Sequence, residues 1–410
     1  RGHSELSIKK VLEQLRKARE VHGSRSLYDA NRDVYGLLRY GVKVRPEIGE
    51  HHETIWLVDW EHPGNNDFAI AEEVTILGQH TKRPDIVLYV NGLALAVLEL
   101  KRSTVNVSEG VRQNLDNQTP TFIRDFFATI QLVLAGNETE GLRYGVIETP
   151  EKHFMTWRDD CEIANPLHRG LYQLCRKPRL LEIIHDFIVF DAGTKKSCRH
   201  NQYFGVQAAQ EHIRRRAGGI IWHTQGSGKS LTMTWLARWI REHITDARVL
   251  IITDRVELDE QIEKVFKGVN EDIYRTRSGA DLMDTLNASQ RWLICSLVHK
   301  FHTDAEGDVD SYIQDLRSHL PRGFKPKGSL FVFVDECHRT QSGKLHQAMK
   351  KLLPDAVFIG FTGTPLLRAD KVQSIEIFGP YIHTYKYDEA VKDGVVLDLI
   401  YEARDIDQQL

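Results

Sequence analysis

A glycine-rich stretch in the second half of the chain has the composition of a phosphate-binding loop. It consists of Gly226, Ser227, Gly228, Lys229 and Ser230, between an apolar run over 220–222 and an amphipathic segment over 231–240. The glycines lack the Cβ atoms that would keep backbone N–H groups away from phosphates, and a following helix adds partial positive charge. We therefore expect Lys229 to reach the β- and γ-phosphates of a nucleotide and Ser230 to bind Mg²⁺.

One residue of this stretch departs from the full phosphate-loop pattern. His223 stands where the pattern has a glycine, so only the second half of the stretch matches strictly. A Gly/Ser-rich turn with an exposed lysine is the alternative interpretation. The apolar run before the stretch and the amphipathic segment after it favour the nucleotide site, because that site requires a strand, a loop and a helix in this order.

Two later apolar runs also end in polar residues that could act on a nucleotide. The run over 330–334 is followed by Asp335 and Glu336, and the run over 357–360 is followed by Thr362 and Thr364. Asp335 would hold the Mg²⁺ of MgATP through water, and Glu336 would orient and activate the hydrolytic water. The two threonine hydroxyls could link the nucleotide site to bound nucleic acid.

A second group of candidate residues lies on a predicted hairpin over 85–101. Asp85 opens the first strand, Asn91-Gly92 is a turn signal, and Glu99 and Lys101 close the second strand on one face. A strict two-residue loop would pair Asp85 with Leu98 and turn it away from Glu99. A three-residue loop over 90–92, with a bulge at Gly92, would pair Asp85 with Val97 and bring the charged residues together. The chemical hypothesis requires this second register.

Two carboxylates and a lysine on one face suit phosphodiester hydrolysis. Asp85 and Glu99 would hold one or two Mg²⁺ ions, while Lys101 would orient or deprotonate the attacking water or stabilise the transition state. A solvated Glu99–Lys101 pair at a strand end is the alternative. The strand over 93–100 is almost continuously apolar, which indicates burial on both faces and favours a chemical role.

This hairpin resembles the PD-(D/E)-x-K nucleases, in the arrangement found in type I restriction enzymes. The resemblance rests on Arg83-Pro84-Asp85, on Asn91-Gly92 and on residues 98–101. It implies a supporting role for Gln113, although the tyrosine that this family has four places on is Asn117 here. Upstream, Glu72 or Glu73 could be an additional metal ligand, but a solvated strand face is the favoured interpretation for both.

The second half resembles the superfamily 2 helicases and translocases, because the glycine-rich loop, Asp335-Glu336 and Thr362-Gly-Thr364 follow one another as motifs I, II and III do. The resemblance implies that Gln207 contacts adenine. It also implies that Thr253 and Arg255 lie near DNA, although an ordinary strand-end charge is equally consistent with Arg255. The family places ATP between two RecA-like domains, and too few residues follow Thr364 for a second one. We therefore expect an N-terminal part of a longer subunit that binds ATP but hydrolyses it slowly.

The order of predicted elements gives an α/β fold in both halves. Residues 1–192 are expected to form a restriction-endonuclease-like α/β domain, residues 193–385 a RecA-like parallel-sheet P-loop domain, and residues 386–410 the start of a connection onward. Alternating strands and helices in the second half indicate a parallel sheet whose carboxyl edge binds ligands. Its expected strands are Gly219–Trp222, Val249–Ile252, Trp292–Ser296, Leu330–Val334 and Val357–Gly360.

Composition indicates how many domains the chain has and in which compartment it works. A chain of 410 residues with 41% hydrophobic and 27% charged residues is expected to fold into two or three soluble domains. Its net charge of −3 means that DNA contacts must come from local patches. The five cysteines lack metal-site spacing and no apolar run is long enough to span a membrane, so a reducing cytoplasm is expected.

Together the resemblances imply the restriction and motor subunit of a type I restriction enzyme. Such a subunit would use ATP and Mg²⁺ to move and cut double-stranded DNA, with separate methylation and specificity subunits as partners. A stand-alone helicase-nuclease for repair or defence shares the same motifs. A nucleotide-gated DNA-binding module with an inactive nuclease domain is an alternative from a different class.

Overall fold

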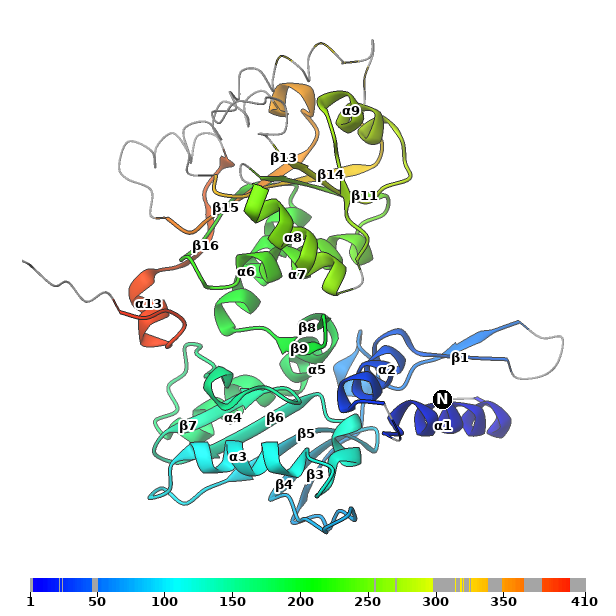
Figure 1. Ribbon diagram of the computed structural model, residues 1–410, viewed down its shortest axis with the longest axis vertical. Helices are drawn as coiled ribbons and strands as arrows, with labels where there is room; N and C mark the ends of the chain where they lie inside the picture. Colours follow the sequence, from blue (N-terminus) through cyan, green and yellow to red (C-terminus); the bar gives the residue numbers. More distant parts are fainter. Residues whose placement is uncertain are drawn as a thin grey trace, which may run out of the picture. The chain divides into compact units, whose positions relative to one another are not determined.

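The chain forms two compact units, Arg1–His200 and Asn201–Leu410 (Figure 1). The computed structural model describes residues 3–21, 23, 25–45, 51–253, 256–269, 271–297, 314, 318, 320, 324, 326–337, 349–364 and 378–398. The hairpin of β8 (Ile188–Asp191) and β9 (Thr194–Ser197) is part of the first unit. It is anchored there by buried Lys195, whose Nζ donates hydrogen bonds of 2.7 Å to Asn31 Oδ1 and Gln131 Oε1.

The first unit is built on a five-stranded sheet in the order β3-β4-β5-β6-β7. Its strands are β3 (Phe68–Glu72), β4 (Ile86–Val90), β5 (Leu93–Leu100), β6 (Leu132–Asn137) and β7 (Gly141–Gly145). Only β5 and β6 are parallel, and the crossover between them contains helix α3 (Val107–Asn117). Gly110 lets α3 approach this pair closely, since a Cβ there would lie 3.2 Å from Ala135 Cβ and 3.5 Å from the Glu99 carbonyl oxygen.

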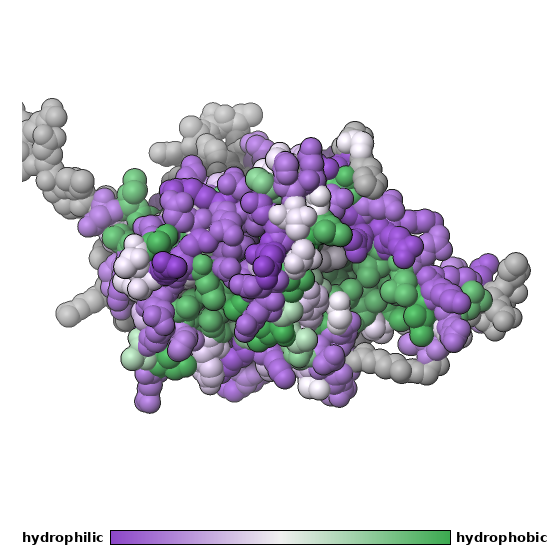
Figure 2. Space-filling view, turned by 90° about the horizontal axis from the view of Figure 1, so that it is seen from below, coloured by the Kyte–Doolittle hydropathy of each residue, from purple (hydrophilic) through white to green (hydrophobic). Residues whose placement is uncertain are grey.

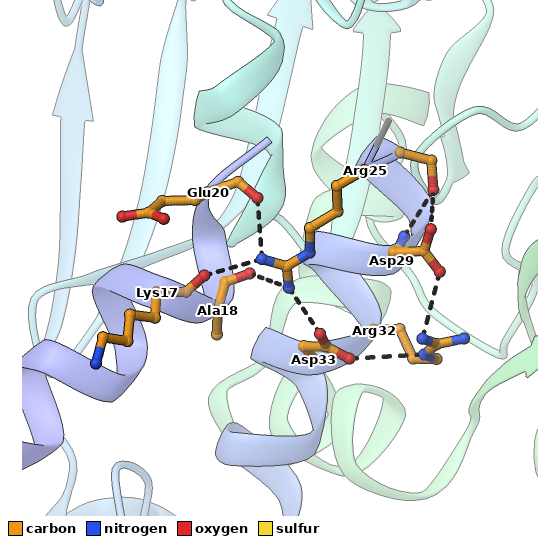
Figure 3. A network of polar contacts seen from close by, with 8 residues as sticks. Lys17, Ala18, Glu20, Arg25, Asp29, Arg32 and Asp33 are labelled. Atoms are coloured by element: carbon orange, nitrogen blue, oxygen red, sulfur yellow. Dashed lines mark hydrogen bonds and ion pairs between the residues drawn. The ribbon is translucent and has the colours of Figure 1, made fainter. Parts of the chain in front are cut away.

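Helices and a small sheet complete the first unit. The helices are α1 (Glu5–Arg19), α2 (Leu27–Tyr40), α4 (Pro166–Cys175) and α5 (Lys177–Asp186), and β1 (Val42–Val44) pairs with β2 (Glu53–Ile55). Figure 3 shows how Arg25 joins α1 to α2. Its guanidinium donates to the carbonyl oxygens of Lys17 and Ala18 at 2.9 and 2.8 Å, and to Asp33 of α2 at 2.6 Å. The carbonyl groups at the end of α1 are thereby satisfied by a cation.

Part of the apolar face of α1 remains at the surface. Leu6, Ile8 and Leu12 are 47%, 46% and 56% exposed, whereas Val11 and Leu15 are buried. Three residues of α1 border a groove of about 270 Å³, which is lined by Ile8, Val11, Leu12, Ile55, Trp56, Leu57 and Asn91. Figure 2 shows one face of the molecule, on which hydrophobic patches lie between hydrophilic residues.

The second unit is built on a seven-stranded parallel sheet in the order β12-β13-β11-β14-β15-β10-β16. All the expected strands are present, as β10 (Gly219–His223), β11 (Ala247–Thr253), β13 (Leu293–Leu297), β14 (Ser329–Val334) and β15 (Val357–Thr362). The two strands at the edges, β12 (Tyr274–Arg275) and β16 (Tyr381–Tyr385), were not predicted. The central strands are almost wholly buried, which explains their continuous apolar sequence.

Helices lie on both faces of this sheet. The helices α6 (His200–Arg214), α7 (Lys229–His243) and α8 (Val256–Gly268) lie on one face and α9 (Gly279–Asn287) on the other, while α13 (Tyr387–Lys392) follows β16 (Figure 1). No strand is present over 396–398, and the rest of the expected connection lies outside the described residues. None of the helices described is both long and apolar enough to cross a lipid bilayer.

Candidate nuclease and nucleotide sites

The hairpin brings Asp85 and Glu99 together through a register that neither sequence alternative contained. The turn is a two-residue loop, because Val90 pairs with Leu93, and Asn91 and Gly92 have φ of 50° and 79°. The extra residue lies instead within β5, since Tyr89 pairs with Ala94 and Leu88 with Ala96. Both predicted registers are therefore wrong.

The bulge in β5 nevertheless places the two carboxylates on one face, as the chemical hypothesis requires. Ile86 pairs with Leu98, so that the next position along the hairpin sets Asp85 opposite Glu99. Residues opposite each other in an antiparallel pair point to the same face of the sheet. The backbone N–H of Leu100 donates to Asp85 Oδ2 at 2.6 Å, which fixes the aspartate at the end of the hairpin.

Gln113 on α3 connects the glutamate to the lysine. Its Nε2 donates to Glu99 Oε2 at 2.7 Å, and its Oε1 accepts from Lys101 Nζ at 2.5 Å. An amide is suited to this bridge because it carries both a donor and an acceptor. The three side chains predicted for this part of the site are thus joined by direct hydrogen bonds.

Glu99 has the most strongly perturbed environment in this group. Its side chain is fully buried, and this burial, together with the neighbouring Asp85 carboxylate, raises the pKa of Glu99 to about 8. Its Oε1 accepts no hydrogen bond from the described residues. A buried carboxylate oxygen without a donor, beside a second carboxylate, is suited to a divalent cation such as Mg²⁺.

The upstream glutamates do not add to this pair. Glu72 and Glu73 are both exposed, and Glu73 accepts a hydrogen bond of 2.6 Å from Arg83. Within the described part of the chain there is no cluster of three or more acidic, histidine or cysteine side chains that could hold a metal. The acidic donors at this site are therefore Asp85 and Glu99.

Lys82 is a cation near this site that sequence reasoning missed. Its positive charge partly offsets the rise in the pKa of Glu99, after the larger contribution of Lys101. Its Nζ lies 4.0 Å from the ring centroid of Phe122. The loop leading to Lys82 is fixed beside that ring, because the N–H of Gln79 donates to the Phe122 carbonyl at 3.2 Å. A lysine shortly before Asp85 was the available signal in the sequence.

The glycine-rich loop has the expected order of strand, loop and helix. It connects β10 to α7, and its glycines, Gly226 and Gly228, have φ of 81° and 89°. Ser227 is buried, and its Oγ donates to the Thr224 carbonyl at 2.6 Å. Gln202 of α6 donates to the Gly228 carbonyl at 3.0 Å. The two ends of the loop are thus fixed, and α7 begins at Lys229 with Ser230 in its first turn.

The acidic pair after β14 lies beside this loop. Lys229 Nζ is 3.8 Å from Glu336 Oε1, and both side chains are mostly buried. Glu336 has a φ of 48°, and its N–H donates to Asp335 Oδ1 at 3.0 Å. Gly363, after β15, allows this close packing, since a Cβ there would lie 2.7 Å from Lys229 Nζ. Three segments distant in sequence therefore meet at the carboxyl edge of the sheet.

The remaining predicted residues are distributed around this edge. Thr362 Oγ1 accepts from the Thr364 N–H at 3.2 Å, which closes a turn after β15. Thr253 is fully buried at the end of β11, and its Oγ1 has no hydrogen-bond partner among the described residues. Gln207 lies half-buried in α6. Arg255 falls outside the described residues.

Family comparisons agree with this division into two units. Residues 201–410 match the family described as SWI2/SNF2 ATPase. The chain belongs to the SWI2/SNF2 ATPase family. In the first unit, residues 3–152 match a second family, described as type I restriction enzyme R protein N terminus. The predicted resemblance is confirmed for both halves.

Curated relatives match the chain across both units. The chain is 28% identical to a putative type I restriction enzyme MjaIXP endonuclease subunit of Methanocaldococcus jannaschii, over 92% of this chain and 39% of the relative. It is 30% identical to the type I restriction enzyme HindI endonuclease subunit of Haemophilus influenzae, over 91% of this chain and 38% of the relative. The chain thus spans about two fifths of their length.

Solved structures also resemble part of the SWI2/SNF2 ATPase chain. One is the Sulfolobus solfataricus SWI2/SNF2 ATPase core in complex with dsDNA, at 14% identity and a TM-score of 0.36. The match covers 51% of this chain and 40% of that one.

Proposed function

We propose that this chain contains the nuclease and motor parts of a type I restriction enzyme subunit. It would use ATP to move double-stranded DNA and would cut that DNA with Mg²⁺. The observation that carries the proposal is the hydrogen-bonded set of Glu99, Gln113 and Lys101, with Asp85 opposite Glu99, in a chain that also contains a glycine-rich loop between a strand and a helix. Neither half alone would couple translocation to cleavage.

In the nuclease site each side chain has a distinct task. Asp85 and Glu99 would hold Mg²⁺, which supplies charge stabilisation at the scissile phosphate and a more acidic water. Gln113 orients both Glu99 and Lys101 through its two hydrogen bonds. Lys101 then presents its ammonium group to the attacking water or to the charge that develops on the phosphate.

In the motor site, nucleotide binding would exchange the partner of Lys229. Lys229 lies near Glu336 in the structure. A triphosphate in the loop offers Lys229 a stronger partner and leaves Glu336 available to orient the hydrolytic water. Ser230 and Asp335 would hold the Mg²⁺ of MgATP, and Gln207 would contact adenine.

The partners follow from the same assignment. We propose that methylation and specificity subunits supply target recognition, as separate chains of one restriction complex. Thr253, Arg255, Thr362 and Thr364 would couple the nucleotide site to double-stranded DNA. All five cysteines are free thiols, and this is consistent with the cytoplasm as the place of action.

Cleavage of long DNA by the whole protein, with and without methylation and specificity subunits, tests the proposal. Lys101→Ala should abolish Mg²⁺-dependent cutting and leave ATP binding intact, while Lys229→Ala should abolish ATP binding and the cutting that depends on ATP. Lys152→Ala, at an exposed position of the first unit, is the control and should behave as wild type. Normal cutting by Lys101→Ala in the assembled complex would refute the nuclease assignment.

A further inference from the structure

His223, the residue that replaces a glycine of the phosphate-loop pattern, makes a chain of contacts across the second unit. Its ring is fully buried at the end of β10, where the loop begins. Its Nε2 lies 2.9 Å from Nδ1 of His383 in β16. On the other side, Asn201 Nδ2 of α6 lies 3.5 Å from its Nδ1.

The donors and acceptors of Asn201, His223 and His383 can complement one another. With its amide nitrogen towards His223, Asn201 can donate to Nδ1 of that ring. A neutral His223 that carries its proton on Nε2 can donate to Nδ1 of His383 while its own Nδ1 accepts from Asn201. In this arrangement each donor faces an acceptor. The two contacts therefore connect α6 to β10 and β10 to β16.

Strand β16 and the segment after α13 each make one further contact near the glycine-rich loop. The N–H of Thr224 donates to the Tyr385 carbonyl at 2.9 Å. After α13 the chain returns to the loop, because a Cβ on Gly226 would lie 3.4 Å from Val396 Cγ1. Among the described strands, β16 lies at an edge of the sheet and pairs with β10 alone. The conformation of the loop therefore depends on how well this edge strand is docked.

Gly205 of α6 shows how closely the histidine pair is packed. A Cβ there would lie 2.9 Å from His223 Cε1, 3.1 Å from His223 Nε2 and 3.7 Å from His383 Nδ1. A methyl group at this position would press on the His223 ring, including its Nε2, and would lie in ordinary contact with His383 Nδ1. The pair can thus be perturbed from a third residue without changing either histidine.

We propose that His383 is a positioning residue for nucleotide binding, which holds the phosphate loop in its receiving conformation through His223. The inference rests on the proposed binding of ATP and names a residue that lies outside the sequence motifs for it. Loss of the hydrogen bond would let the loop leave the conformation that it has between β10 and α7. Only molecules with the loop in place can then bind a nucleoside triphosphate. The apparent Kd therefore rises as the fraction of such molecules falls.

Binding of a fluorescent ATP analogue with Mg²⁺ to the whole protein tests this. His383→Ala should raise the Kd of the analogue about three- to tenfold, the range expected for one hydrogen bond. Gly205→Ala should raise it similarly, and His383→Asn, which keeps an acceptor near the Nδ1 position, should restore most of the affinity. A His223→Ala/His383→Ala double variant should be no weaker than the worse single variant.

His212→Ala is the matched control. His212 also lies on α6, and its Nδ1 is 3.2 Å from the Gly218 carbonyl, at the opposite end of β10 from the loop. The His212→Ala substitution should lower the melting temperature of the protein without changing the Kd of the ATP analogue. Wild-type affinity in His383→Ala, or an equal loss in His212→Ala, would overturn the inference while ATP binding stands. Absence of binding by the wild-type protein would refute the proposed function and this inference with it.

Discussion

Replacing Glu99 by glutamine should change how the stability of the first unit depends on pH. The new side chain would keep the shape of the old one and could still accept the hydrogen bond from Gln113. It removes the buried group that titrates. Because an amide can also donate, it could satisfy Asp85, which faces it from the opposite strand. The substitution thus isolates the effect of one ionisable group.

The expected magnitude follows from the perturbed pKa. Burial and Asp85 raise the pKa of Glu99 from its ordinary value of 4.5 to about 8. Between these values the folded protein keeps a proton that the unfolded chain releases. The stabilising contribution is therefore complete below pH 4.5 and is lost as pH rises towards 8. The loss is on the order of 5 kcal/mol, at about 1.4 kcal/mol for each unit of pKa.

Scanning calorimetry in EDTA, from about pH 5 to about pH 9, compares the two proteins over this window. The wild-type transition that contains the first unit should weaken as pH rises, and E99Q should be nearly level there. Mg²⁺ should then stabilise the wild type more than E99Q, most strongly at the alkaline end, because binding displaces the proton. Parallel pH profiles for the two proteins, or equal stabilisation by Mg²⁺, would refute this account of the site.

Three further substitutions test other parts of the structure. Gly363→Ala should weaken ATP binding about tenfold, measured by titration, because its Cβ would displace Lys229 Nζ. Arg248→Ala should destabilise the second unit by about 3 kcal/mol in denaturant unfolding, since its buried guanidinium donates to four backbone carbonyls. Lys82→Gln should slow DNA cleavage about tenfold without changing ATPase activity, if the cation beside Phe122 binds a DNA phosphate; unchanged cleavage would assign Lys82 a structural role only.

The sequence predicted most of the elements because buried parallel strands have a local signature. The runs that became β11, β14 and β15 are apolar throughout, and each ends in polar residues at one edge of the sheet. The edge strand β16 lacks this signature, because four of its five residues are only half-buried. Its docking is decided by contacts with β10, which are distant in sequence.

In the hairpin, the turn residues predicted the turn but not the pairing of the two strands. Asn91-Gly92 predicts a tight turn, and the turn is present. Whether Asp85 faces Glu99 depends, however, on one extra residue within β5, in a run of alternating leucines and alanines that carries no bulge signal. A shift by one residue reverses every side chain of a strand, so the local sequence could not fix the register. The packing of α3, which brings Gln113 to Glu99, was needed to select it.

The burial that makes β5 recognisable also determines the chemistry at its end. A strand covered on both faces removes water from Glu99, and this raises the energy of its charged form. Asp85 adds to that cost, so the pair favours a bound proton or a bound cation over two free charges. Lys101 is kept apart from Glu99 by Gln113, which occupies the positions where a direct ion pair would form. In the proposed nuclease, this separation would leave the lysine to act on the substrate and the glutamate to bind Mg²⁺.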